Sequence, residues 1–200
     1  MHHRTRNTLL FVAASAFTAY ASAHTGADAH SHGGFISGFV HPLAGLDHLA
    51  AMVAVGLWSA LTARRAGADL LWGPAGFAAL LLVGAVLGLA GVALPGVEHM
   101  IAASLLVTGL LVVSRQRMPG AVAALLVGVF ALFHGLAHGY ELAQQSQAAA
   151  TLAGMLAATV LLHVTGLGLG WALRNRPVWL GRAAGASVAA LGAGLLVQMI

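Results

Sequence analysis

Two short motifs hold most of the residues in this chain that could do chemistry. The first reads H-P-L-A-G-L-D-H-L-A-A-M from His41 to Met52, and it places two histidines and an aspartate at the head of an otherwise apolar run. In one continuous helix, His41 and His48 would share a face because they are seven residues apart, and Asp47 would lie on its flank. A carboxylate inside a bilayer costs about 2.5–3.5 kcal/mol on insertion scales. Such a residue indicates a metal or proton site.

The second motif reads F-H-G-L-A-H-G-Y-E and ends at Glu141. His134 and His138 are four residues apart, so a helix would present them on one face, with Glu141 one turn beyond. A carboxylate beside imidazoles orients the rings and stabilises a bound cation. Since ionisable residues inside a membrane are functional candidates by default, we predict that both motifs bind a metal ion.

Three further polar residues are candidate metal ligands with an equally simple structural explanation. Glu98 and His99 open an apolar run, where a carboxylate could merely favour the positive end of the helix dipole. His163 lies midway along a later run, where a single imidazole could simply bond to a carbonyl group of a neighbouring helix. We keep all three in the predicted metal set.

The composition predicts an all-α integral membrane protein. Charged residues make up 7% of the chain and hydrophobic ones 60%, whereas soluble domains carry about 25% charged residues. The basic residues are nine arginines in short clusters between apolar runs, a pattern that sets topology and argues against a nucleic-acid partner. Without cysteine, no thiolate site can form, so imidazole and carboxylate ligands favour ions such as Ni²⁺, Co²⁺, Zn²⁺ or Cu²⁺.

Residues 1–23 resemble a secretory signal peptide, with a positive start, a short apolar core and an Ala-Ser-Ala cleavage site. A retained first helix is the alternative. We expect residues 24–40 to form a periplasmic histidine-rich tail. Cleavage would give His24 a free amino group that can chelate a cation together with its imidazole, and His30 and His32 follow closely. The tail could equally be a polar spacer, since such tracts suggest metal binding only by composition.

Residues 41–200 are expected to form a six-helix transmembrane domain, because six apolar runs approach the roughly 20 residues that a span requires. Every arginine-bearing loop falls on one side of this arrangement, which the positive-inside rule makes cytoplasmic. Both mature termini then face the periplasm of a bacterial inner membrane. The expected spans cover residues 41–63, 70–94, 98–114, 120–139, 149–173 and 180–199.

The two histidine motifs resemble the signatures of the HupE/UreJ family of bacterial nickel/cobalt permeases. That resemblance implies a secondary permease that imports Ni²⁺ or Co²⁺ for urease, hydrogenase or cobalamin synthesis. It carries the metal-binding role to His41, Asp47, His48, His134, His138 and Glu141. The chain has no lysine and therefore no nucleotide-binding G-x-x-x-x-G-K-[ST] loop, which agrees with transport independent of ATP.

The expected mechanism begins with capture of the ion by the tail histidines together with Glu98, His99 and Glu141. The ion then sheds water onto the aspartate and histidines of the two motifs. No permanently bound cofactor is expected, the partners are the metal ion and the lipid bilayer, and a homo-oligomer is left open. An intramembrane zinc hydrolase is the alternative, since histidines and an aspartate around Zn²⁺ could activate water. A metal sensor or store is a second alternative.

Overall fold

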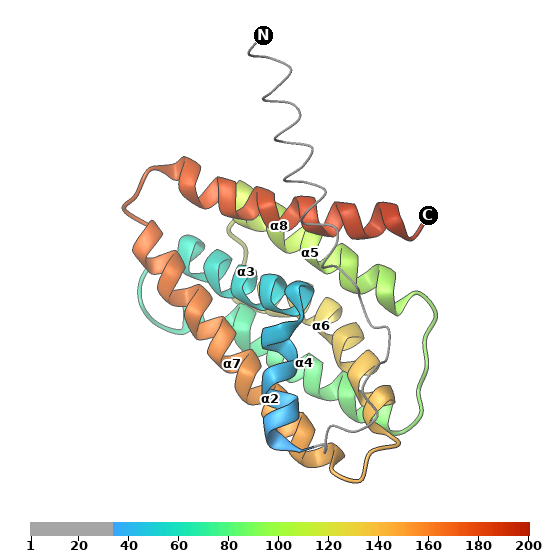
Figure 1. The fold of residues 1–200 in the computed structure, drawn as a ribbon. Helices are drawn as coiled ribbons and strands as arrows, with labels where there is room; N and C mark the ends of the chain where they lie inside the picture. The colour runs from blue at the N-terminus through green and yellow to red at the C-terminus, as the bar shows by residue number, and fades with distance from the viewer. Residues whose placement is uncertain (1–33) are drawn as a thin grey trace. The chain divides into compact units, whose positions relative to one another are not determined.

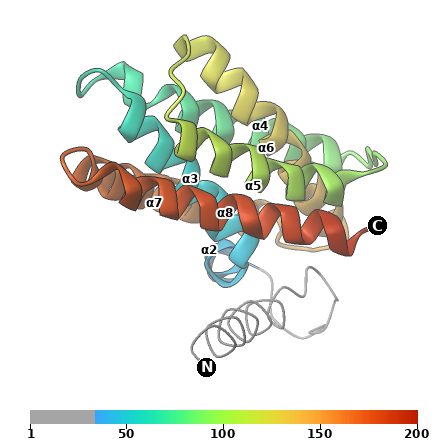
Figure 2. The same ribbon diagram turned by 90° about the horizontal axis from the view of Figure 1, so that it is seen from above.

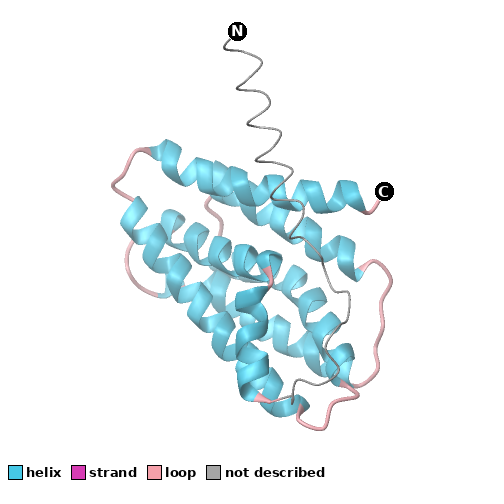
Figure 3. Cartoon of the chain, viewed as in Figure 1, coloured by secondary structure: helices cyan, strands magenta, loops and turns pink. Residues whose placement is uncertain are grey.

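The structure, a computed structural model, describes residues 34–200, and this part of the chain is helical without strands (Figure 3). The expected signal peptide 1–23 and the tail histidines His24, His30 and His32 lie outside the described residues. The helices are α2 (Phe35–Ala44), α3 (Leu46–Thr62), α4 (Trp72–Leu89), α5 (Val97–Ser114), α6 (Gly120–Leu142), α7 (Ala148–Leu173) and α8 (Val178–Gln198), with a short 3₁₀ helix η1 (Ala68–Leu70).

The prediction of six apolar spans is confirmed, with one difference of shape. Helices α4 to α8 are each long and apolar enough to cross a membrane, and α2 with α3 makes the sixth span only as a bent pair. The span expected to reach residue 94 ends at Leu89, because Gly91 takes a positive φ of 85°. The amide groups of Gly91 and Val92 then bond back to carbonyl oxygens of the last turn of α4, which terminates the helix.

The first span is broken, which corrects the expectation of one continuous helix from His41. Helix α2 begins at Phe35, inside the expected tail, and meets α3 at an angle of 81° (Figure 1). Pro42 lies inside α2 rather than at a helix start, and its missing N–H removes a backbone hydrogen bond just before the break. Gly45 then adopts an extended conformation that ends α2 and begins α3.

The helices pack in pairs through small residues: α4 with α6, α3 with α7, α2 with α7, and α5 with α8. Helices α5 and α8 lie side by side in both views (Figure 1, Figure 2). At Gly135 of α6, an added Cβ would collide with the backbone oxygen of Leu81 in α4, and Gly166 of α7 abuts Val53 of α3 in the same way. Such close backbone approach is how membrane helices associate.

The loops that carry arginine gather at one end of the helices. The Arg174 guanidinium, after α7, donates to the carbonyl oxygen of Ala63 at the end of α3. The Trp58 indole, near the same end of α3, donates to the carbonyl oxygen of Gln116 in the loop after α5 at 3.0 Å. The motif histidines of α3 and α6 lie toward the opposite end of these helices.

Candidate metal site

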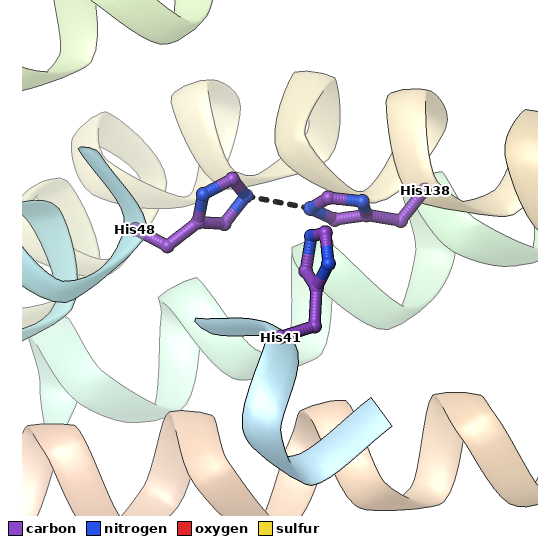
Figure 4. Close-up of side chains that lie close together, drawn as sticks. All are labelled: His41, His48 and His138. Carbon is purple, nitrogen blue, oxygen red and sulfur yellow. Dashed lines mark hydrogen bonds between the residues drawn. The ribbon is translucent and has the colours of Figure 1, made fainter. Parts of the chain in front are cut away.

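Three histidines from three different helices converge on one point. His41 comes from α2, His48 from the first turn of α3, and His138 from the last turns of α6 (Figure 4). One ring nitrogen of each lies within 4.8 Å of those of the other two. His48 and His138 are buried, and His41 is partly exposed. Three imidazole nitrogens at such distances could bind one divalent ion of the borderline class.

The bend at Gly45 brings the two histidines of the first motif together. In a straight helix, residues seven apart are separated by about 10.5 Å along the axis, too far to share an ion. Across the bend, the ring centroids of His41 and His48 are 5.4 Å apart. A Cβ at Gly45 would lie 3.0 Å from Nδ1 of His48 and 3.1 Å from Oδ1 of Asp47. The glycine therefore leaves the room that these two side chains need.

Within the cluster, Nε2 of His48 lies 2.6 Å from Nε2 of His138 (Figure 4). This is a hydrogen-bond distance, so one of the two nitrogens carries the proton in this arrangement. An ion with metal–nitrogen bonds of about 2.0–2.1 Å would hold two such nitrogens roughly 3 Å apart. A shift of less than about 1 Å between the two rings would therefore make room for a metal ion in place of the shared proton.

Each of these two histidines has a carboxylate on its other nitrogen. Nδ1 of His48 lies 2.8 Å from Oδ1 of Asp47, and Nδ1 of His138 lies 3.4 Å from Oε2 of Glu141. The Asp47 side chain is largely buried, whereas that of Glu141 is about half exposed. With an ion in place of the proton between the two Nε2 atoms, a carboxylate on Nδ1 would fix that nitrogen as the donor and leave Nε2 to bind the ion, as around many metal-binding histidines.

His134 lies behind this three-histidine site rather than in it. Its ring centroid is 5.4 Å from that of His48, and its Nε2 is 3.0 Å from the hydroxyl oxygen of Ser104 in α5. Ser104 donates its own proton to the carbonyl oxygen of Ile101, so its oxygen accepts from Nε2 of His134. The sequence does not predict the contact between Ser104 and His134, because only the fold brings α5 next to α6.

The remaining candidates are not part of this cluster. Glu98 and His99 are exposed in the first turn of α5. His163 is buried in α7 against the ring of Phe77, at a centroid distance of 5.1 Å, and its Nε2 has no hydrogen-bond partner among the described residues. Phe77 also lies 5.9 Å from the ring of His134, so it stands between two histidines. Sequence reasoning missed Phe77, since an aromatic residue in an apolar span carries no distinguishing signal.

Comparison with known proteins adds an independent finding. Residues 12–195 match the sequence model of a family described as HupE / UreJ protein. The chain is also 46% identical over 189 residues to Protein HupE of Rhizobium leguminosarum bv. viciae. The aligned region covers 93% of this chain and 95% of that protein. No solved structure matches.

Proposed function

Because the chain belongs to the HupE/UreJ family, we propose that it imports Ni²⁺ or Co²⁺ across the bacterial inner membrane without ATP. The observation that carries the proposal is the convergence of His41, His48 and His138 on one point. In this role the metal ion is the cargo, and the three imidazoles are its ligands during capture.

The carboxylates supply charge and orientation in this proposal. Asp47 and Glu141 each lie against Nδ1 of a ligand histidine. Two negative charges at this distance stabilise a divalent cation, and the geometry leaves both Nε2 atoms for the ion. We further propose that His134 takes part in transfer away from this site, since its ring lies next to His48.

The proposed orientation in the membrane is supported by the distribution of charge. Arginine-bearing loops gather at one end of the described helices and the three-histidine site lies toward the other. By the positive-inside rule the arginine end is cytoplasmic, so the histidines face the periplasm, as do the mature termini. Glu98 and His99, exposed at the start of α5, then belong to the entrance side, together with the tail histidines.

Family membership and the site both favour transport over the zinc hydrolase considered from the sequence. In a hydrolase, a carboxylate separate from the metal ligands should reach the bound water. Here Asp47 and Glu141 both contact imidazole nitrogens of the cluster. This arrangement suits ion binding better than water activation.

Uptake of radiolabelled nickel and cobalt tests the proposal in cells that lack their own importers. We expect the wild-type chain to accumulate metal, and Asp47→Asn and His48→Ala to lose at least nine-tenths of the uptake at matched membrane levels. Thr165→Ala is the matched control, because that exposed hydroxyl bonds only to its own helix at Leu161. No uptake above empty cells by correctly inserted wild-type protein would refute the transporter proposal.

A further inference from the structure

A polar cavity of about 430 Å³ opens at the end of α3 opposite the histidines. It lies where the end of α3, η1 and the first turns of α4 and α6 meet. Ser59 and Trp72 line it together with three charged side chains, Arg64, Asp69 and Arg117. Its volume lies within the usual range for small-molecule sites.

The cavity and the metal site share one face of α3. His48, Met52, Val55 and Ser59 follow one another at intervals of three or four residues, so they point the same way. Ser59 is eleven residues beyond His48, which is about 16 Å along the helix axis. Met52, Val55 and the nearby Phe77 are at most 1% exposed and lie in one core cluster. A closed apolar layer therefore separates the cavity from the histidines.

The polar groups of the cavity are not engaged with one another. Among residues 34–200, no hydrogen bond or ion pair involves the side chains of Arg64, Asp69 or Arg117. The Ser59 hydroxyl also makes no hydrogen bond there, although that residue is only 4% exposed. The Ser59 hydroxyl and the three exposed charged side chains around it are therefore available to a ligand.

The charge of the cavity favours an anion over a bare cation. Two arginines and one aspartate line it, and this excess of positive charge opposes the entry of a divalent ion alone. Guanidinium forks bind carboxylates through two parallel hydrogen bonds. An ion that leaves three imidazoles toward this end would meet repulsion unless an anionic chelator receives it.

We propose that this cavity binds a small multidentate carboxylate, which accepts the metal ion on the cytoplasmic side. The inference rests on the proposed function for the direction of metal flow. In the proposed complex, the carboxylate groups of the ligand contact Arg64 and Arg117, and Asp69 attracts the metal ion that the ligand holds. Ser59 donates to the ligand at the inner end of the cavity.

Binding of radiolabelled citrate to the purified full chain in phosphatidylcholine nanodiscs tests the site without any transport. We expect saturable binding that is at least tenfold weaker in the double variant Arg64→Gln/Arg117→Gln. The matched control is Arg176→Gln/Arg182→Gln, which removes the same charge from exposed positions outside the cavity lining. We expect the control to bind citrate like the wild type.

Three results would overturn the proposal. The first is no saturable citrate binding to the wild type, and the second is equal weakening in both double variants. The third is full displacement of citrate by a small fraction of phosphatidylglycerol, which would assign the cavity to a lipid headgroup.

Transport measured in proteoliposomes separates this proposal from the proposed function. Metal uptake that citrate inside the vesicles does not accelerate refutes the acceptor role alone, whereas citrate binding without any metal uptake refutes the proposed function and the acceptor role with it.

Discussion

The carboxylate of Asp47 lies 2.8 Å from Nδ1 of its chain neighbour His48, while Nε2 of the same ring faces His138. The two contacts are on opposite sides of the imidazole. In the proposed metal site, Asp47 would therefore act through His48, by fixing which nitrogen carries the proton and by adding a negative charge nearby.

Asp47→Asn tests this relationship. The amide keeps the size of the side chain but removes its charge, so we expect the affinity for Ni²⁺ and Co²⁺ to fall about 10–100-fold. Calorimetric titration of the purified protein measures it. Ser187→Ala should bind metal like the wild type, because that exposed hydroxyl donates only to its own helix at Ala183. Unchanged affinity in Asp47→Asn would remove the aspartate from the site.

Gly45→Ala tests the bend between α2 and α3. The added Cβ would lie 3.0 Å from Nδ1 of His48, so the ring and the Asp47 carboxylate must shift. Overpacking of this kind costs about 1–3 kcal/mol, and we expect metal affinity and uptake to drop roughly tenfold. Gly168→Ala serves as the control, because an added Cβ there meets no atom within 4 Å. Equal behaviour of the two variants would argue against the role of the bend.

The sequence predicts the spans well because hydropathy and turn residues act locally. The expected spans 98–114 and 149–173 differ from α5 and α7 by one residue at their starts. The break at Gly45 is not local. Pro42 favours a helix start, which is how the sequence is interpreted, whereas in the structure it lies inside α2, and α2 packs against α7.

The proposed metal site is predictable in its residues but not in their arrangement. Residue type and membrane depth place His41, His48 and His138 among the candidate ligands, but they do not separate these three from the other candidates, such as His163. The carboxylate contacts of Asp47 and the position of His134 behind His48 depend on side-chain geometry that spacing does not encode. The cavity is still less predictable, since its lining comes from loops and helix ends distant in sequence.

Gly135→Ala tests the packing that holds α6, and with it His138, against α4. Its Cβ would collide with the backbone oxygen of Leu81, which cannot move aside as a flexible side chain can. We expect a loss of stability of about 1–3 kcal/mol or more, seen as a lower unfolding temperature in detergent. Gly194→Ala should unfold like the wild type, because nothing lies within 4 Å of its added Cβ. A stable Gly135→Ala protein would contradict the close approach of the two helices.

His163→Leu distinguishes a structural histidine from an ion ligand on the inward route. The imidazole is 3% exposed and its Nε2 has no hydrogen-bond partner among the described residues, an arrangement that costs about 1–3 kcal/mol. A leucine of similar size removes that cost, so we expect stability to be equal or higher. We propose that His163 receives the ion beyond Phe77, and we therefore expect uptake to fall at least tenfold.

Thermal unfolding and nickel uptake, measured on the same His163→Leu preparation, distinguish the two roles. For an ion ligand we expect equal or higher stability and reduced uptake. A less stable protein with normal uptake per folded molecule would make His163 a structural residue and remove it from the route. Leu162→Ala provides a comparison at the neighbouring buried position, where the lost apolar contacts should lower stability by about 2–5 kcal/mol. Because residue 162 contributes no ligand atom, uptake per folded molecule should stay at the wild-type level in that variant.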